Sequence, residues 1–522
     1  MERRVLLAAV LSGVVIILWF TLFAPPRPAV APAPPTPAAT QGAAPGATPQ
    51  ETTPTPPPGP APPAVVGSEA AEVALSGDGW KGLVSPRGAV ITSLILSEYK
   101  DQAGAPLDLV RSGGSLPLAI AVPGAWNDDL YQVEQGAGWV ALRWSDGKGN
   151  WVEKRVSVGR GKFALQVEVR AGGEPARAGV VLAAGLEKSA KAEQGRFASS
   201  DAVVGLGGKI ERVNAAKLDG VKTVRGPLDF AGVEDQYFLV ALLPSEGVEQ
   251  ALVRGVGSGP AAVPQVVLVG REGVIRGMLY AGAKERNTLL GYGRGLEQTL
   301  SFGLFGFLSV GFLAALRWIY GWAANWGVAI IILTAGIRIL LFPLNHKSAV
   351  AMKRMQVLQP KMKAIQDRYK ERAKKDPNVR TRMNQEVMAL YKQEGVNPMG
   401  GCVPMLVQLP ILWALYSLFA YAIELRQAPF VFWIKDLAAK DPTYITPILM
   451  TASMVLQQRM APQMGDPAQR RMFMLMPFIF GFMFMSFPAG LVLYWLVNNL
   501  FTIGQQMLTE RLMANPSPAP PK

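Results

Sequence analysis

The stretch IIILTAGIRILLFPL, residues 330 to 344, places an arginine inside a long apolar run that begins at Trp326. As a helix rising about 1.5 Å per residue, this run covers most of the roughly 30 Å hydrocarbon core of a bilayer. An arginine at the centre of a membrane helix costs about 2.5 to 3.5 kcal/mol on insertion scales, so Arg338 needs a partner or water. The stretch therefore predicts a membrane-spanning helix with a functional polar residue.

The N-terminal residues differ in composition from this run. Residues 1–24 are predicted to be a transmembrane anchor, because the apolar run 5–24 follows Arg3 and Arg4, which favour a cytosolic start. A cleaved signal peptide is the alternative, although the apolar part of a signal peptide is typically about 7 to 15 residues long. Residues 25–67 form a Pro/Ala-rich tract that is predicted to be a disordered linker, since it holds too few large apolar side chains for a core.

Residues 68–295 carry the pattern of antiparallel β-structure. Two short apolar runs flank DGKGN, residues 146–150, which is a hairpin signal. In KFALQVEVRA, residues 162–171, apolar and polar side chains alternate as on a half-buried strand. This pattern predicts a large all-β sandwich domain. Because the region contains no histidine and no obvious acid/base pair, a binding or scaffold role is favoured over carbohydrate chemistry.

Charge decides which C-terminal segments span the membrane. The loop at 345–401 contains 13 Lys/Arg and 5 Asp/Glu, which predicts a cytosolic position. With the sandwich outside, only one of the two segments before this loop can span. Residues 326–344 are uninterrupted, whereas 296–322 are glycine-rich with an aromatic and basic end, and are predicted to form an in-plane amphipathic helix. The later segments then alternate across the membrane and return the C-terminus to the cytosol: 403–423, 444–458, 472–487 and 489–508.

The predicted fold is thus a multi-pass α-helical membrane protein with a five-helix core at 323–512 and the N-terminal anchor. Residues 345–398 within it predict a cytosolic helical hairpin, because apolar residues from Met352 to Tyr369 recur at spacings of three and four. Pro377, after Asp376, fits the first position of the second helix. The basic outer surface of the hairpin is either simply solvated or docks an anionic partner such as lipid head groups or ribosomal RNA.

Two environments would accommodate Arg338. The side chain could snorkel to the cytosolic head groups, but Cα–Cβ bonds tilt toward the helix N-terminus, here the outer side. The alternative is a water-filled recess lined by polar residues of the spans: Thr334, Gln408, Ser417, Asn498, Asn499, Gln505 and Gln506. No Asp or Glu lies in the middle of a predicted span to neutralise the arginine, so its charge would remain able to attract anionic groups of an incoming chain.

Two of the predicted spans are short, and one of them is rich in flexible methionine side chains. Residues 444–458 and 472–487 fall below the roughly 20 residues needed to cross a bilayer, which predicts local thinning of the membrane. The second segment reads MFMLMPFIFGFMFMSF, and flexible methionines adapt to varied apolar partners. Ordinary lipid-facing packing explains this composition equally well.

Several functional classes remain open at this point. A transporter or channel for small anions could use the same arginine, although no paired second bundle or inverted repeat is present. A membrane-anchored sugar-binding or sugar-processing protein is a second alternative. No zinc-binding cysteine or histidine cluster and no GxxxxGK[ST] motif occurs, since Cys402 and His346 are single, so neither a metal nor a cofactor is expected.

The membrane part resembles the bacterial YidC membrane protein insertases of the YidC/Oxa1/Alb3 family. The resemblance is dense over residues 320–512, and the anchor, outer sandwich and in-plane helix follow the layout of the Gram-negative members. Besides the Arg338 span, it is carried by NPMGGCVPMLVQLPILWALY at 397–416, ELRQAPFVFWIKDL at 424–437, DPTYITPILM at 441–450 and FPAGLVLYWLVNN at 487–499.

The resemblance implies a membrane protein insertase and chaperone, not an enzyme, which works alone or with the Sec translocon. It further implies a hydrophilic groove that is open to the cytosol and lipid and closed outside. The implied substrate-binding groove residues are Arg338, Thr334, Gln408, Tyr494, Trp495 and Asn498. The implied hydrophobic slide, along the third and fifth spans, consists of Leu412, Met476, Phe480 and Met483. Many relatives have two tyrosines where this chain has Tyr494 and Trp495.

The resemblance also implies partners and location. Nascent membrane proteins, the Sec translocon and membrane lipids are the expected partners, and DNA is not. Some members contact the ribosome through a long basic tail, but residues 513–522 contain one lysine, so ribosome contact would fall to the cytosolic loops. The expected location is the bacterial inner membrane, with both termini in the cytosol and residues 25–322 in the periplasm.

Overall fold

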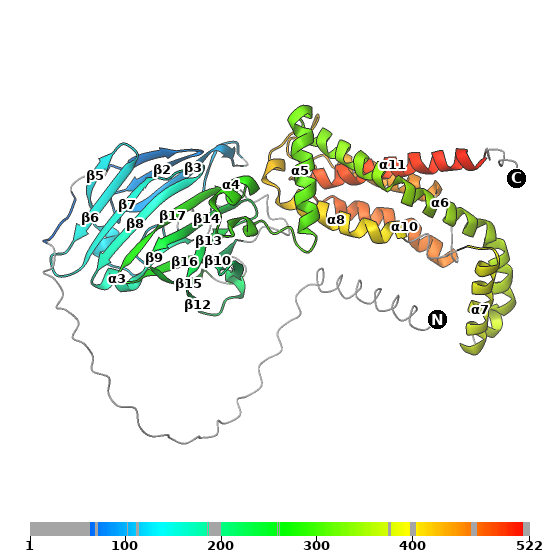
Figure 1. Ribbon diagram of the computed structural model, residues 1–522, viewed down its shortest axis with the longest axis horizontal. Helices are drawn as coiled ribbons and strands as arrows, with labels where there is room; N and C mark the ends of the chain where they lie inside the picture. Colours follow the sequence, from blue (N-terminus) through cyan, green and yellow to red (C-terminus); the bar gives the residue numbers. More distant parts are fainter. Residues whose placement is uncertain are drawn as a thin grey trace, which may run out of the picture. The chain divides into compact units, whose positions relative to one another are not determined.

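The computed structural model describes residues 63–67, 71–101, 103–110, 114–184, 186, 200–257, 259, 262–373, 377–396, 403–460 and 467–514. The predicted anchor at 1–24, the predicted linker up to residue 62 and the tail from residue 515 lie outside the described residues. In chain order, the described residues form a β-domain and then a helical domain (Figure 1).

The β-domain is a sandwich of antiparallel sheets, as predicted. Its nine-stranded sheet has the order β11 (Lys209–Asn214), β10 (Asp201–Leu206), β13 (Leu228–Glu234), β14 (Phe238–Glu246), β17 (Val274–Ala283), β8 (Ala164–Gly172), β7 (Trp151–Val158), β6 (Trp139–Ser145) and β5 (Gln132–Gly136). A four-stranded sheet packs on it through β16 and β9, in the order β12 (Val221–Arg225), β15 (Val248–Val256), β16 (Val263–Gly270) and β9 (Val180–Ala184).

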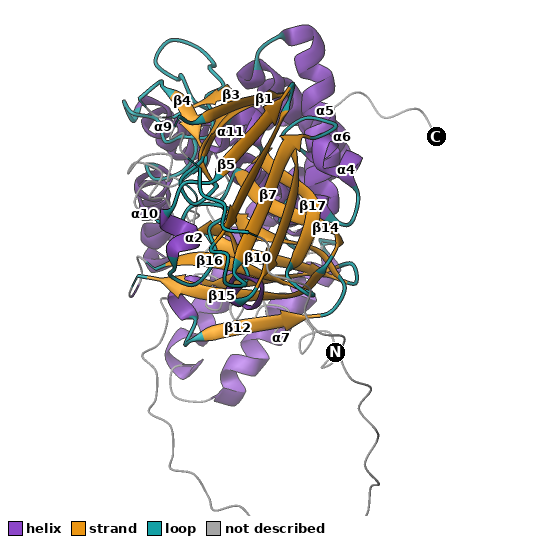
Figure 2. Ribbon diagram, turned by 90° about the vertical axis from the view of Figure 1, so that its left-hand side faces the viewer, coloured by secondary structure: helices purple, strands orange, loops and turns teal. Residues whose placement is uncertain are grey.

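A second four-stranded sheet contacts the other half of the large sheet through β1 and β7, in the order β1 (Val73–Gly77), β2 (Trp80–Ser85), β3 (Val90–Lys100) and β4 (Pro106–Asp108). Figure 2 shows the β15–β16 strands crossing the direction of β7 and β17. Short helices occupy the connections: α2 (Ala125–Asp128), α3 (Glu174–Ala178) and α4 (Arg286–Tyr292).

Local sequence patterns explain these strands. The hairpin predicted around residues 146–150 is confirmed, because β6 and β7 pair with Ser145 opposite Trp151. Asp146 closes its turn by accepting a backbone hydrogen bond from Lys148 at 2.7 Å. The alternation predicted in β8 is also confirmed, since Val167 is buried and Gln166 is exposed. Apolar side chains that alternate along a strand all reach one face, and here that face is the sandwich core.

A lysine lies inside this core. Lys154 on β7 is 0% exposed, and its Nζ donates a hydrogen bond to the carbonyl of Gly88 at 2.6 Å. The ammonium is also 5.5 Å from the ring centroid of Tyr131. Burial lowers the pKa of Lys154 to about 7, because the charged form loses its hydration without gaining a carboxylate partner among the described residues.

This lowered pKa predicts a pH-dependent stability. Between pH 7 and about 10 the unfolded chain carries a proton on Lys154 that the folded domain lacks, so the free energy of unfolding should rise with pH. The slope is at most about 1.4 kcal/mol per pH unit. Hydrogen exchange of the β6–β8 amides in the full chain measures it, and Lys154→Met should remove the slope. Equal slopes for both proteins would contradict this account.

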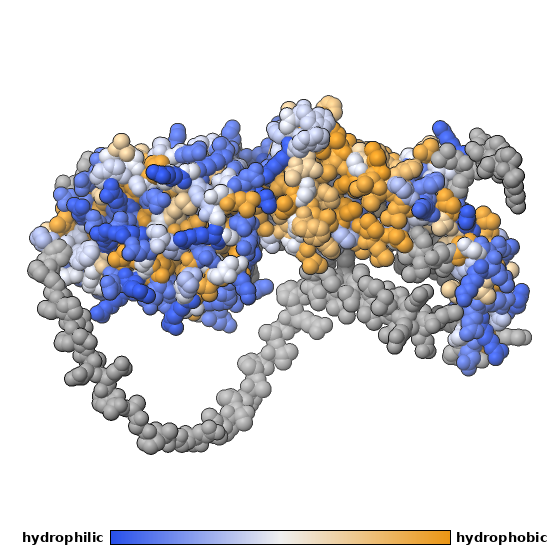
Figure 3. All heavy atoms as spheres, viewed as in Figure 1, coloured by the Kyte–Doolittle hydropathy of each residue, from blue (hydrophilic) through white to orange (hydrophobic). Residues whose placement is uncertain are grey.

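The helical domain contains seven helices among the described residues: α5 (Gly306–Ala323), α6 (Trp326–Ala373), α7 (Pro377–Gln393), α8 (Val403–Tyr421), α9 (Ile445–Met460), α10 (Pro467–Phe484) and α11 (Ala489–Ala514). By length and apolar composition, α6 qualifies as a membrane span, and α8 and α10 contain shorter apolar helical stretches. Figure 3 shows an apolar surface over the middle of this domain and a polar surface over α7.

Helix α6 is longer than the predicted span. Its 48 residues continue without a break from the span into the first arm of the hairpin, past Pro343 and Pro360. The second arm, α7, begins at Pro377, and Met355 and Leu358 of α6 pack against Tyr391 of α7. One continuous helix therefore connects the level of Arg338 to the hairpin.

Helix α5 differs from the other helices in direction. Figure 1 shows it running across the ends of α6 and α8. It buries Ser309, Leu313 and Leu316, and the Ser309 hydroxyl donates a hydrogen bond to the carbonyl of Ala414 in α8 at 2.9 Å. Its opposite face exposes large aromatic side chains, including Trp318 (73%) and Trp322 (59%).

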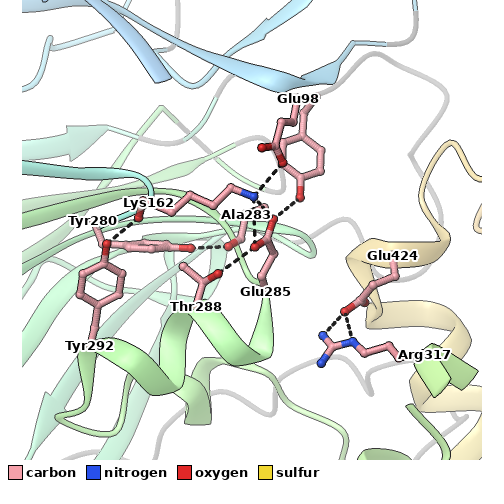
Figure 4. A network of polar contacts seen from close by, with 10 residues as sticks. Glu98, Lys162, Tyr280, Ala283, Glu285, Thr288, Tyr292, Arg317 and Glu424 are labelled. Carbon is pink, nitrogen blue, oxygen red and sulfur yellow. Dashed lines mark hydrogen bonds and ion pairs between the residues drawn. The ribbon is translucent and has the colours of Figure 1, made fainter. Parts of the chain in front are cut away.

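Polar contacts fix the start of α4 and the end of α5 (Figure 4). Glu285 accepts hydrogen bonds from Tyr99 at 2.6 Å and from Lys162 at 3.0 Å. Burial opposes the charge of Glu285, but these hydrogen bonds hold its pKa below the usual value. Arg317 on α5 pairs with Glu424, which follows α8, and its other terminal nitrogen donates a hydrogen bond to Asn287 of α4 at 3.2 Å.

The Arg317–Glu424 pair is predicted to support α5. Arg317→Glu places two carboxylates together and should cost roughly 1 to 3 kcal/mol, below the range for fully buried pairs because the two side chains are 28% and 16% exposed. The exchanged pair, Arg317→Glu with Glu424→Arg, should recover part of the loss. Thermal unfolding in detergent measures both, and a double variant no more stable than the single one would argue against the pairing.

Candidate functional site

The polar side chains of the helical core converge on α11. Tyr494 accepts a hydrogen bond from Gln408 of α8 at 2.6 Å, and Asn498 accepts one from Arg338 of α6 at 2.6 Å. Tyr494 and Asn498 are one helical turn apart, so they share a face of α11. This face therefore joins α6 and α8 through polar contacts.

The neighbouring face of α11 joins the other two core helices. Asn499 donates a hydrogen bond to the Ser453 hydroxyl of α9 at 3.0 Å. The Trp495 ring lies 5.1 Å, centroid to centroid, from Phe484 of α10. Two pairs of neighbouring positions, one turn apart on α11, thus contact four different helices, which makes α11 the centre of the core.

Arg338 is half-buried, and its side chain contacts α11. Its Nε–H is bonded to the neutral amide of Asn498. A guanidinium has five N–H donors, and the other four have no protein acceptor among the described residues. No ion pair of the described residues includes Arg338 either. The helix-to-helix hydrogen bond positions the side chain without cancelling its charge.

Thr334 lies one turn before Arg338 and is 2% exposed. Its hydroxyl donates a hydrogen bond to the carbonyl of Ile330 at 2.6 Å, within the same helix. Thr334 is therefore one helical turn from Arg338, but its hydroxyl hydrogen is already used in a hydrogen bond to the backbone of α6.

A cavity of about 720 Å³ lies between residues 338–343 of α6 and residues 500–508 of α11. Of the six residues predicted for the groove, Arg338 lines this cavity and the others do not. The rest of the lining is mainly apolar: Ile339, Phe342, Pro343, Leu500, Phe501, Gly504, Gln505 and Leu508. The guanidinium thus borders a largely apolar hollow on one side and a line of hydrogen-bonded polar groups on the other.

The residues predicted for the hydrophobic slide do not all have the same surroundings in the structure. Leu412 of α8 and Phe480 and Met483 of α10 pack against the buried core cluster. Met476 is half-buried. The exposed apolar face of α10 is formed by other side chains: Phe473, Met474, Leu475, Phe478, Ile479 and Phe482.

Two partners of α11 were not among the predicted residues. Ser453 is the hydrogen-bond partner of Asn499, and Phe484 supports Trp495. A serine that interrupts the apolar run 444–458 is a signal that could have identified the first. Phe484 is one of many apolar residues in its segment and carries no such signal. Among the described residues, no cluster of three metal-binding side chains occurs.

The short helices α9 and α10 approach each other closely at one glycine. A Cβ atom at Gly481 would lie 2.1 Å from the Thr451 hydroxyl oxygen. Thr451 is anchored by its own hydrogen bond to the Pro447 carbonyl at 2.8 Å, so it cannot move away freely. The contact therefore depends on the missing side chain at residue 481.

Gly481→Ala should destabilise the core by about 1 to 3 kcal/mol through overpacking, despite a gain in helix propensity of up to about 1 kcal/mol. Gly311→Ala is the matched control, because a Cβ at this helical glycine of α5 meets nothing within 4 Å. It should be neutral or stabilising. Thermal unfolding in detergent compares the two, and equal melting temperatures would refute the close approach.

Comparisons with known proteins cover both domains. The family model described as "YidC periplasmic domain" matches residues 72–314, and the one described as "60Kd inner membrane protein" matches residues 318–516. The membrane protein insertase YidC of Geobacter metallireducens is 36% identical over 540 residues, covering 98% of this chain and 99% of the relative. The membrane protein insertase YidC of Nitratidesulfovibrio vulgaris is 33% identical over 542 residues, covering 97% of this chain and 98% of the relative.

Solved structures give weaker likenesses. A crystal structure described as an active YidC insertase with the first transmembrane domain resolved has 17% identity and a TM-score of 0.37, covering 85% of this chain and 94% of that one. YidC from Thermotoga maritima has 15% identity and a TM-score of 0.30, covering 85% and 99%. A GalM/aldose epimerase homologue from C. elegans has 9% identity and a TM-score of 0.28, covering 41% and 99%.

Proposed function

The chain belongs to the YidC family of membrane protein insertases, and from this premise we propose that it inserts integral membrane proteins into the inner membrane and assists their folding, alone or with the Sec translocon. The proposed site is a groove around Arg338 that is open to the cytosol and lipid and closed outside. The family is one of insertases and not of enzymes, and the proposed mechanism uses no cofactor.

The observation that carries this proposal is the environment of Arg338. Its only hydrogen-bond partner among the described residues is the neutral Asn498 amide, 2.6 Å away. A cation in a medium of low dielectric constant that lacks a counter-ion attracts an incoming carboxylate more strongly than the same cation in water. An acidic or polar segment of a nascent membrane protein is the guest that this charge would favour.

The short helices beside the groove would shorten the distance that a polar segment of the substrate has to cross in the bilayer. Helices α9 and α10 have 16 and 18 residues, or about 24 and 27 Å of helix, against a hydrocarbon core of roughly 30 Å. A span shorter than the bilayer favours local thinning. While the polar segment occupies the groove, the apolar segment of the guest would slide along α8 and the exposed methionine-rich and phenylalanine-rich face of α10.

The proposed topology places both termini in the cytosol and residues 25–322 in the periplasm. The hairpin formed by α6 and α7 then lies in the cytosol, where its basic surface would contact lipid head groups or a translating ribosome. Ion pairs such as Lys361–Glu394 at 2.6 Å use some of its cations, but the surrounding sequence retains an excess of positive charge. DNA is not a proposed partner.

The electrostatic part of the mechanism has a direct test. Asn498→Asp puts a carboxylate beside the Arg338 guanidinium and should neutralise it, lowering insertion of substrates with acidic translocated segments by about tenfold or more, the factor that corresponds to 1.4 kcal/mol. Neutral substrates should be affected less. Protease protection of translocated segments in proteoliposomes provides the measurement.

Asn498→Leu is the control, because it removes the acceptor of the Arg338 hydrogen bond without adding a charge, so the arginine charge stays uncompensated. It should retain the preference for acidic segments, whereas Arg338→Gln should lose it. If both Asn498 variants affect acidic and neutral substrates alike, the charge of Arg338 has no part in substrate capture. Unchanged insertion of small membrane proteins after depletion of the chain would overturn the insertase function as a whole.

A further inference from the structure

The loop between α8 and α9 carries an exposed apolar tip formed by Val431 and Phe432. The neighbouring Trp433 is half-buried, packs against the helical core and donates a hydrogen bond from its ring nitrogen to Asp441 at 3.3 Å. Phe432 is 84% exposed, and Val431 is 41% exposed. The Phe432 and Trp433 rings are stacked, with centroids 5.9 Å apart. A phenylalanine almost fully in water is unfavourable, since burying such a side chain is worth roughly 1.5 to 3 kcal/mol.

The backbone at the tip is also strained. Phe432 has a φ of +51°, a left-handed conformation that glycine adopts readily and bulky residues rarely do. A glycine would remove both the strain and the exposed ring. Retention of a strained, exposed aromatic residue points to a role for the side chain outside the folded chain.

The base of the loop is rigid. Phe430 N donates a hydrogen bond to Ile434 O at 2.9 Å, and Leu437 N donates one to Ala428 O at 3.1 Å. Ile434 and Leu437 are 3% and 0% exposed, respectively. The tip is therefore presented by a closed, packed loop, so little conformational entropy would be lost when it binds.

The loop is tied to the beginnings of two core helices. The Asn325 side chain, just before α6, donates a hydrogen bond to Phe430 O at 3.0 Å. At the beginning of α11, Gly490 N donates one to Leu437 O at 2.8 Å. Gly327 allows Phe430 to pack against α6, since a Cβ there would lie 2.0 Å from the Phe430 ring. The tip is thus fixed at the level where α6 and α11 begin.

The surroundings indicate what the tip contacts. In α9, which follows the loop, Ile448 and Leu449 are 56% and 49% exposed, as expected for side chains that face lipid. Lys435 and Lys440 are exposed in the loop, whereas Asp441 is buried and accepts hydrogen bonds from Thr443 and Thr446. An aromatic tip with exposed lysines beside it matches the boundary between acyl chains and anionic head groups.

We propose that Val431 and Phe432 insert into the outer leaflet of the membrane, at the boundary between head groups and acyl chains, and hold the beginnings of α6 and α11 at a fixed depth. The inference rests on the proposed topology, which puts this loop on the outer side. It gives the two helices that carry Arg338 and Asn498 a fixed position relative to the bilayer surface.

The test uses the full chain in bilayers that contain phosphatidylglycerol. In a Cys402→Ser background, which removes the single cysteine, a cysteine is introduced at Phe432 or Val431 and labelled with an environment-sensitive fluorophore. Ala439→Cys is the matched control, because this residue is exposed in the same loop beside Lys440. Ile448→Cys reports independently whether α9 is immersed.

The labels at residues 431 and 432 should show blue-shifted emission and several-fold stronger quenching by lipids with a shallow spin label than the label at 439. Quenching at 432 equal to that at 439, while 448 is immersed, would overturn the membrane insertion of the tip. Water exposure at both 432 and 448 would instead overturn the topology. Protection of 432 only after a substrate or translocon is added would assign the tip to a protein partner and reject the lipid proposal.

Discussion

The hydrogen bond between Arg338 and Asn498 is the contact that defines the proposed site. It orients a guanidinium inside an apolar helix bundle while leaving the charge uncompensated, because the acceptor is a neutral amide. A carboxylate at the same position would hold the arginine more strongly and would also cancel its charge. The arrangement therefore favours availability of the charge over stability of the fold.

This contact is possible because α11 serves as the common partner of the core helices. Tyr494, Trp495, Asn498 and Asn499 contact α8, α10, α6 and α9, respectively. Buried polar groups that are left without partners are costly, so each of these side-chain contacts restricts how its helix can rotate about its axis. The hydrogen bonds thereby fix the rotation of α6 that turns Arg338 toward the inside of the bundle.

The position of the helices along their axes is determined by different contacts. Arg317 connects α5 to the residues after α8, and the loop that carries Phe432 is tied to the beginnings of α6 and α11. These contacts lie at the opposite end of the core from the hairpin of α6 and α7. These contacts thus connect the core helices at one end of the core, while at the other end α6 continues as a long helix into the hairpin.

The sequence by itself determined the class of this protein. Apolar length, the basic loop and the alternation around Phe163 depend on composition and period, so they predicted the membrane helices, the hairpin and the sandwich without three-dimensional information. The sequence also singled out Arg338, because a charge in an apolar run is conspicuous. Only the tertiary structure decided that Asn498 is its partner, that Thr334 is committed to its own helix and that Phe480 faces the core. Those outcomes depend on helix rotation and packing between residues up to 160 positions apart in the chain, and no local pattern encodes such distances.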